Sequence, residues 1–302
     1  ELAASPAPGV LQDPAGDLVH VQSDRGASLG LGIYSPTTLF NLRMCEVWRI
    51  PPAGAWPDLA TYLRRALATA VDHRRQLGLM EPEGGCRLVQ GDGDRLPGLV
   101  ADRYADCVVL QTTSPVMEAQ LSSVIVPELQ RLTSARCILA RNDKSLRRVE
   151  GLDLYKRVLH GESCPDHVII TEDGVQHVAN PLEGQKTGFY LDQRGTRAKV
   201  KALAKGRRIL DLYSYHGGMA LAALAGGATE AVCVDESERA LACACTAASL
   251  NGVRDRLSVV QGDAKAVARN LQKHGERFDL IVVDPPAAAK SQQRLSSAMG
   301  YL

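Results

Sequence analysis

The segment ILDLYSYHGG (209–218) decides the fold, because it has the pattern of a short apolar strand that runs into a glycine turn. The strand, expected over Ile209–Tyr213, carries Asp211, and Gly217 and Gly218 precede a helix expected over Met219–Ala225. Glycines at such a turn let a bound molecule approach the backbone closely. Taken alone, the segment is also compatible with glycines that are ordinary turn residues.

The same strand-and-helix pattern repeats downstream of this segment. Further strands are expected over 231–235, 257–261 and 280–284, and the intervening helices over 238–251 and 264–274. Strands and helices that alternate in this way predict a parallel, doubly wound sheet with right-handed crossovers.

An acidic residue stands at the end of each of four successive strands: Asp211, Asp235, Asp263 and Asp284. Ligands of open parallel sheets bind beyond the carboxyl ends of the strands. There Asp235 can accept from two ribose hydroxyls and Asp263 can receive an adenine amine, which suits an adenosyl group. The GxGxxG turn that holds a pyrophosphate is missing, which disfavours a nicotinamide oxidoreductase. S-adenosylmethionine carries no phosphate, and Asp211 suits its cationic end.

The sequence Asp284-Pro285-Pro286 marks the place where a methyl acceptor would arrive. Two prolines make this loop rigid and poor in hydrogen-bond donors. A plain strand-ending turn is the alternative for the motif alone. Together with the other three acids, it predicts a methyltransferase with an acceptor loop at these residues.

The chain is nearly neutral, with a formal net charge of +1, so attraction to a nucleic acid must be local. Between residues 186 and 208, eight Lys or Arg face one acid, Asp192. Arg194, Arg197 and Lys199 are therefore candidate contacts to RNA phosphates. A solvated helix face is the competing interpretation for Lys199.

The composition is that of a globular protein, with 45% hydrophobic and 23% charged residues among 302. No apolar run is long enough for a membrane span. The eight cysteines are scattered, without zinc-ligand spacing, and are expected to be small buried residues, so no metal site is predicted.

The first half of the chain has a different pattern. Alternating segments at 18–21 and 29–34 predict a β-hairpin, and 59–79 predicts a helix. From residue 86 to about 180, strands at 86–90, 98–104, 107–111, 137–140 and 167–171 and a helix over 116–132 predict an α+β module.

By its motifs the sequence resembles the bacterial large-subunit rRNA cytosine-C5 methyltransferases of the RlmI type, built from a PUA domain, an EEHEE domain and a Rossmann-like domain. The stretches that carry the resemblance are VQSDRGASLGLGIYSPTTLFNLR (21–43), RLVQGDGDRLPGLVADRY (87–104), RNDKSLRRVEGL (141–152), GQKTGFYLDQR (184–194), ILDLYSYHGG (209–218), VDES (234–237), QGD (261–263) and DPPAAAK (284–290). QKTGFYLDQR is the most specific of them.

The resemblance implies four parts: a partial PUA-like RNA-binding domain over 1–50, a linker and helix over 51–83, an EEHEE domain over 84–183 and an incomplete methyltransferase domain over 184–302. It implies ribosomal RNA as partner, no membrane, and leaves a homodimer open. The implied S-adenosylmethionine contacts are Lys186, Thr187, Phe189, Asp192, Asp211, Tyr213, Gly217, Asp235, Ser237, Asp263 and Asp284.

Attack by cytosine C5 requires that a thiolate first add to C6. In the family this cysteine follows the Asp-Pro-Pro motif at a position past Leu302, and none of the eight cysteines here occupies it. Two alternatives are a guanine-N methyltransferase of the same fold, which needs no cysteine, and a catalytically incomplete module that binds RNA and the cofactor. Work on ribosomes implies the cytoplasm, or a chloroplast or mitochondrion in a eukaryotic source.

Overall fold

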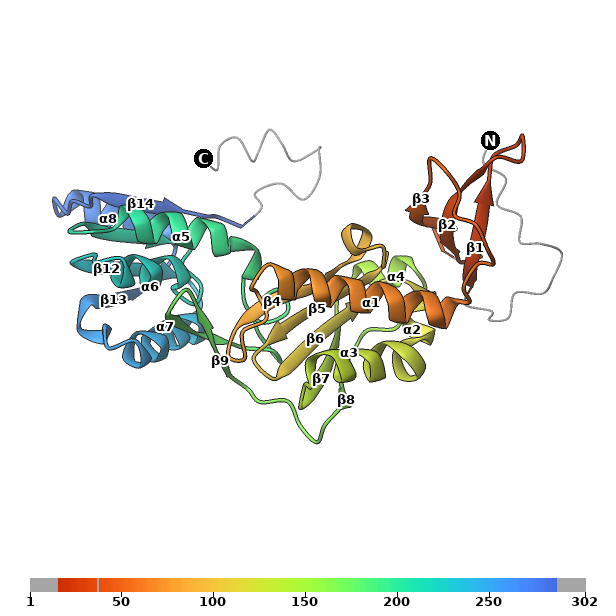
Figure 1. Ribbon diagram of the computed structural model, residues 1–302. Helices are drawn as coiled ribbons and strands as arrows, with labels where there is room; N and C mark the ends of the chain where they lie inside the picture. The colour runs from red at the N-terminus through yellow and green to blue at the C-terminus, as the bar shows by residue number, and fades with distance from the viewer. Residues whose placement is uncertain (1–15, 37, 287–302) are drawn as a thin grey trace. The chain divides into compact units, whose positions relative to one another are not determined.

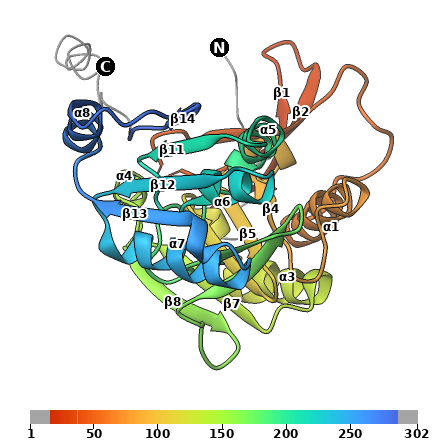
Figure 2. The ribbon, with the colours of Figure 1, turned by 90° about the vertical axis from the view of Figure 1, so that its left-hand side faces the viewer.

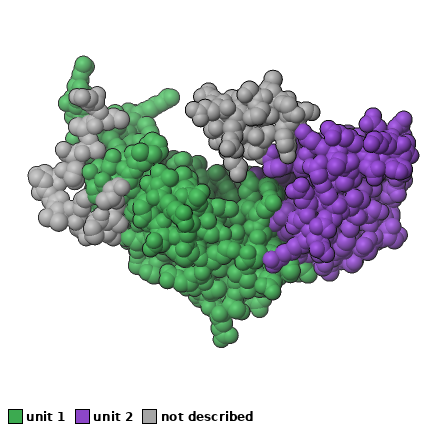
Figure 3. Space-filling model, turned by 180° about the vertical axis from the view of Figure 1, so that it is seen from behind, with its two compact units in different colours: residues 1–170, 179–191 green, residues 171–178, 192–302 purple. Residues whose placement is uncertain are grey.

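The computed structural model describes residues 16–36 and 38–286, and the chain forms two compact units (Figure 3). Unit 1 comprises residues 1–170 and 179–191, and unit 2 comprises residues 171–178 and 192–302.

A three-stranded antiparallel sheet begins unit 1 (Figure 1). Its strands are β1 (Asp17–Gln22), β2 (Ser28–Tyr34) and β3 (Leu42–Val47), in that order. The first two form the predicted hairpin, and Gly26 adopts the left-handed conformation that its tight turn requires, with φ +76°. The third strand was not predicted, and it covers the open edge of β2.

The main sheet of unit 1 has five strands in sequence order: β4 (Gly85–Gln90), β5 (Leu99–Tyr104), β6 (Cys107–Thr112), β7 (Cys137–Asn142) and β8 (Tyr155–His160). Only β6 and β7 pair in parallel. The predicted helix α1 (Leu59–Gln76) buries Leu63, Leu67 and Val71 in a common core with one face of this sheet. The α+β character expected for this region is confirmed.

The helix expected over 116–132 is interrupted. It consists of α2 (Pro115–Ala119), a π-helical turn over Leu121–Ile125 and α3 (Val126–Thr133). Pro127 lies in the first turn of α3, where its missing N–H leaves an upstream carbonyl without its helical donor. Shorter elements are the 3-10 turn Gly91–Asp94, α4 (Leu146–Val149) and the hairpin of β9 (Val168–Glu172) and β10 (Val175–Ala179).

Unit 2 contains the predicted parallel sheet (Figures 1 and 2). Its strands are β11 (Arg208–Leu212), β12 (Glu230–Asp235), β13 (Leu257–Gln261) and β14 (Leu280–Val283), in the spatial order β13-β12-β11-β14. The helices are α5 (Arg194–Leu203), α6 (Gly218–Ala225), α7 (Glu238–Leu250) and α8 (Ala264–Lys273), with 3-10 turns over Leu191–Gln193 and Arg254–Arg256. Every predicted strand and helix of this part is confirmed to within two residues.

Alternate residues of these strands enter two different cores, which is why helices are needed on both faces. On one face Ile209, Ala231 and Cys233 pack with residues of α5, α6 and α7. On the other face Leu210 and Val232 pack with residues of α8. Because both faces of the sheet are packed in cores, the sheet and the carboxyl ends of its strands are held in position.

The boundaries of the two compact units differ from the boundary at 183/184 that the resemblance implies between the EEHEE and methyltransferase domains. Residues 179–191 belong to unit 1, where Phe189 is buried in a core with Tyr104. Residues 171–178 belong to unit 2, where Val175 and Val178 join the core around Ile209. The boundary thus depends on side-chain packing, which a change of strand pattern does not reveal. Within the residues described, no helix is long and apolar enough to cross a membrane.

Candidate functional site

Asp211, near the end of β11, is an acid without access to solvent. Its side chain is buried and accepts a hydrogen bond from the backbone N–H of Ala220, at 3.2 Å, in the first turns of α6. Burial raises the pKa of Asp211 to about 7, the hydrogen bond opposes the change, and the negative charges of Asp235 and Asp284 add to it. A cation placed beside Asp211 would favour its ionised form, which is the property expected of a contact to a cationic ligand.

The turn after β11 is held in an unusual conformation. Tyr213, Tyr215 and Gly217 have positive φ angles of 62°, 50° and 69°. Ser214 donates its backbone N–H to the carbonyl of Val234 on β12, at 3.0 Å, so the neighbouring strand holds the turn in place. Strained backbone of this kind is concentrated at ligand-binding sites, where the surrounding structure must stabilise it.

Gly217 is the residue at which the backbone of this turn lies closest to α7 and β12. A Cβ atom built on it would lie 2.9 Å from the Cβ of Ala244 and 3.3 Å from the Sγ of Cys233. Gly217→Ala should therefore lower the free energy of unfolding by about 2–3 kcal/mol, from left-handed strain and overpacking together. Gly252→Ala is the matched control, because Gly252 has a similar φ of 65° and nothing within 4 Å of the built Cβ. Urea denaturation measures both, and equal losses would show that the close approach is unimportant.

Asp235, at the end of β12, is a carboxylate with both oxygens positioned by the backbone. Its Oδ2 accepts from the N–H of Tyr215 at 2.8 Å, and its Oδ1 accepts from the N–H of Ser237 at 2.9 Å. Ser237 caps α7, because its Oγ accepts from the N–H of Ala240. Each carboxylate oxygen can accept a second hydrogen bond, so a pair of vicinal hydroxyl donors fits the half-buried Asp235.

The acids of the two outer strands, Asp263 and Asp284, follow the ends of β13 and β14. Asp263 is exposed and caps α8 by accepting from the N–H of Ala266 at 2.8 Å. Asp284 is exposed and accepts from the Nε2 of Gln193 at 3.1 Å. Pro285 and Pro286 follow Asp284, and residues 287–290 of the DPPAAAK motif lie outside the described part of the chain.

The negative charges of Asp235 and Asp284 both act on Asp211 and raise its pKa, so three of the four acids interact electrostatically. Two contributors to this region were not predicted. Gln193 holds Asp284, and the N–H of Tyr215 holds Asp235. Gln193 belongs to the motif GQKTGFYLDQR and Tyr215 to the motif ILDLYSYHGG. Neither a backbone N–H nor a side-chain amide is charged, so the sequence does not indicate that these groups bind a carboxylate.

The remaining predicted cofactor contacts lie before α5. Thr187 is buried in unit 1, where its hydroxyl donates to Asp102 at 2.5 Å and shares a hydrogen bond with the hydroxyl of Tyr104. The buried Phe189 packs beside Tyr104, and the exposed Lys186 has its Nζ 5.3 Å from the centre of the Tyr190 ring. Asp192 is exposed and belongs to unit 2. Their contacts to a cofactor stay predictions.

The candidate RNA contacts divide into buried and exposed side chains. Arg197 is 3% exposed and forms a two-pronged ion pair with Glu172, at 2.6 and 2.8 Å. Arg194 reaches the same carboxylate at 3.2 Å, whereas Lys199 is exposed on α5. The expectation that Arg197 contacts phosphate is therefore corrected, because its guanidinium is already buried against Glu172.

A parallel sheet in the order β13-β12-β11-β14, with acids after its strands and a strained glycine turn after the first, defines a Rossmann-like domain of the methyltransferase class. The model of the family "S-adenosylmethionine-dependent methyltransferase" matches residues 87–299. This chain belongs to that family, and S-adenosylmethionine is its cofactor.

Relatives place the chain more closely. It is 37% identical to the ribosomal RNA large subunit methyltransferase I of Aeromonas salmonicida, over 95% of this chain and 71% of the relative. The protein of the same name from Erwinia tasmaniensis is 34% identical, over 95% and 71%. The chain therefore belongs to the group of methyltransferases that bear this name.

Solved structures agree on the fold. A putative S-adenosylmethionine-dependent methyltransferase from Streptococcus mutans superposes with a TM-score of 0.72 at 22% identity, over 96% of this chain and 75% of that one. A putative methyltransferase complexed with SAH gives a TM-score of 0.73 at 23% identity, over 94% and 71%.

Proposed function

We propose that this methyltransferase acts on large-subunit ribosomal RNA and transfers the methyl group to C5 of a cytosine. The names of relatives at 34–37% identity support large-subunit ribosomal RNA as the substrate. The observation that carries the cofactor side is the group of Asp211, Asp235 and Asp284 at the carboxyl ends of β11, β12 and β14.

The residues present fit S-adenosylmethionine, which supplies an electrophilic methyl group when bound. Asp235 would accept from the two ribose hydroxyls, with oxygens that the N–H groups of Tyr215 and Ser237 hold in position. Asp263 would receive the adenine amine, and the buried Asp211 would balance the positive charge of the methionine end. Asp284 and the two prolines after it would hold the acceptor base.

The cytosine proposal requires a thiolate nucleophile in addition to these residues. Cys233 lies in β12 beside the turn, but it is 0% exposed and part of the core, which does not suit attack on a base. A guanine-N acceptor is the alternative that needs no thiolate. Methylation of large-subunit rRNA with isotopically labelled S-adenosylmethionine, followed by mass spectrometry of the nucleosides, tests both. Labelled 5-methylcytidine supports the proposal, and labelled methylguanosine contradicts it.

Asp235→Ala should weaken cofactor binding by about 2 kcal/mol, roughly 30-fold in Kd, because a charge-assisted pair of hydrogen bonds is lost. Calorimetric titration with S-adenosylhomocysteine measures the affinity. Asp255→Ala is the matched control, since Asp255 is an exposed acid before β13, at the opposite edge of the same sheet. If the Asp235 variant binds as tightly as the control, Asp235 lies outside the site.

The RNA side of the proposal concerns the three-stranded sheet of β1–β3, as a PUA-like element, and the exposed Lys199. We place the work of the protein in the cytoplasm, where ribosomes are assembled. A homodimer would show as a doubled mass in sedimentation equilibrium, and a mass near 32.4 kDa would contradict it.

A further inference from the structure

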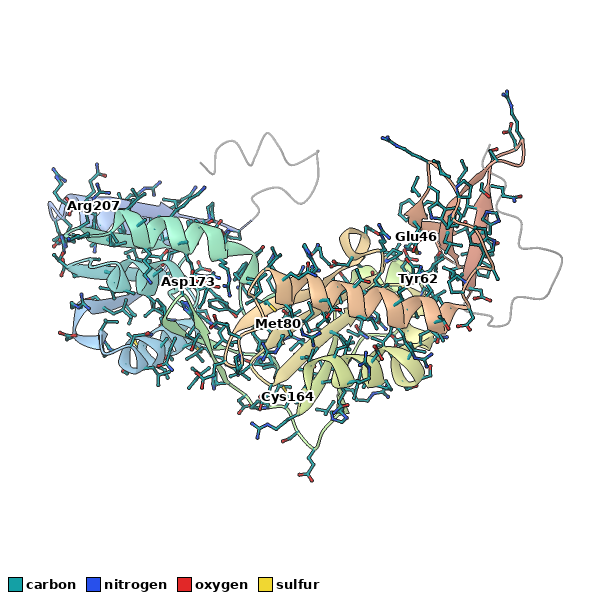
Figure 4. All side chains as sticks on the ribbon, viewed as in Figure 1. Glu46, Tyr62, Met80, Cys164, Asp173 and Arg207 are labelled. Atoms are coloured by element: carbon teal, nitrogen blue, oxygen red, sulfur yellow. The ribbon has the colours of Figure 1, made fainter. Side chains whose placement is uncertain are left out.

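Three cysteines that are far apart in the sequence meet in unit 1. Cys107 begins β6 and Cys137 begins β7. Cys164, labelled in Figure 4, lies in the connection between β8 and β9. Their sulfur atoms all lie within 4.8 Å of one another, and the Sγ atoms of Cys107 and Cys164 are 3.8 Å apart. Among the described residues, this is the one group of three or more His, Cys, Asp or Glu side chains close enough to share a metal ion.

The backbone explains why the sulfurs converge. Cys107 and Cys137 are register partners in the parallel pair β6 and β7, so their side chains point to the same face of the sheet. That face packs against the core that contains Tyr104, Val109 and Leu139. Cys107 and Cys137 are both buried there.

The third thiol is brought to this face by a fixed turn. Gly161 follows β8 with φ +85°, and a Cβ built on it would lie 2.2 Å from the carbonyl oxygen of Arg136, the residue before Cys137. The connection therefore lies against the start of β7. Cys164 packs at the rim of the same core and is itself half-exposed.

The spacing of the sulfurs fits a shared ion better than a disulfide. Tetrahedral bonds of about 2.3 Å from zinc to thiolate place neighbouring sulfurs about 3.8 Å apart, which matches the distance between Cys107 and Cys164. A disulfide would need about 2.0 Å and would leave the third thiol without a partner.

We propose that Cys107, Cys137 and Cys164 form a three-thiolate site for a soft cation, Zn(II) or Cu(I), which ties the β8–β9 connection to the sheet. Thiolates are the ligands that these ions select. Binding exchanges the three thiol protons for the ion, with no change in oxidation state. Zn(II) would take a water molecule as its fourth ligand, whereas three thiolates can satisfy Cu(I).

A titration of the reduced, chelator-treated chain with Co(II) tests the site. We expect one equivalent to produce a thiolate-to-cobalt charge-transfer band, and Zn(II) to remove it. Cys164→Ser should weaken metal binding by at least about 100-fold. Even the loss of a group that only hydrogen-bonds to a metal ligand costs about 10–100-fold in metal affinity, and Cys164 is itself a proposed ligand. Cys245→Ser is the matched control, because Cys245 is also half-exposed but lies in α7. An equal band in both variants would overturn the proposal, and the absence of the band would overturn it for Zn(II).

A second measurement needs no variant. Zn(II) should slow the alkylation of Cys164 by iodoacetamide at least about tenfold in the unmodified chain, and leave Cys245 unchanged, because a metal-bound thiolate is withheld from reaction. A parallel series with Cu(I), buffered by a competing thiol, distinguishes the two ions by their relative protection. Equal alkylation of Cys164 with and without both metals contradicts the site.

Discussion

Asp211→Asn should stabilise the cofactor-free chain by about 2–4 kcal/mol at pH 8 and weaken its binding of S-adenosylmethionine at least tenfold. Burial raises the pKa of Asp211 from 3.8 to about 7, so above pH 7 the folded chain holds an ionised carboxyl away from water. This change in pKa corresponds to about 4 kcal/mol of lost stability at high pH. Asparagine keeps an acceptor for the N–H of Ala220 but adds a buried amide that needs partners, which reduces the gain.

The sign of the pH dependence follows from the raised pKa. Between about pH 4 and pH 7 the folded state binds the Asp211 proton more tightly than the unfolded state. The stability contributed by the protonated group is complete below pH 4, and it is lost as the pH rises through 7. The difference between Asp211→Asn and the unaltered chain should therefore grow from pH 4 to pH 8.

Urea unfolding followed by circular dichroism at pH 5 and pH 8 measures this difference, with Asp255→Asn as the control for removal of an exposed acid. Calorimetry compares S-adenosylmethionine with S-adenosylhomocysteine, which lacks the sulfonium charge. The variant should lose more affinity for the charged ligand. A variant that is less stable at pH 8, or that loses both ligands equally, would show that Asp211 does not act through its charge.

The placement of the four acids at strand ends could be predicted from the sequence because a parallel α/β sheet is a repetitive structure. An acid stands at or near the carboxyl end of each strand from β11 to β14, and the carboxyl ends of parallel strands share one edge of the sheet. The order of the strands could not be read in the same way. β14 is the neighbour of β11 in the sheet, although β12 and β13 lie between them in the sequence. That pairing depends on how the helices cover the two faces of the sheet.

Contacts between residues far apart in the sequence were the part that could not be predicted. Cys107 and Cys137 each open an apolar run and Cys164 stands between Ser163 and Pro165. Only the register of β6 with β7 and the turn at Gly161 bring their sulfurs together. Arg197 stands in a basic stretch that indicates a solvated or RNA-binding surface. Its partner, Glu172, lies in a strand 25 residues earlier, within a hairpin whose second strand was not predicted.

The same hidden ion pair gives the second large effect, since Arg197→Met should destabilise unit 2 by about 3–5 kcal/mol. Glu172 and Arg197 are 4% and 3% exposed, and loss of the guanidinium leaves a buried carboxylate with only the contact to Arg194. The hairpin residue Asp173, next to Glu172 (Figure 4), also accepts from Lys201 of α5 through its carbonyl oxygen. Lys199→Met, an exposed change on the same helix, is the matched control and should stay within about 0.5 kcal/mol.

Two observables separate loss of this ion pair from general unfolding. Both tryptophans of the chain, Trp48 and Trp56, lie in unit 1, so the urea midpoint of their fluorescence transition should not change. The transition followed by circular dichroism, to which unit 2 contributes, should begin at a lower urea concentration. Burial and the charge of Arg197 together lower the pKa of His177 to about 3, and the variant should raise that pKa in an NMR titration. The double variant with Glu172→Met should lose less stability than the sum of the single changes, because no buried carboxylate is left alone. An additive double variant would mean that the two side chains stabilise unit 2 by packing alone.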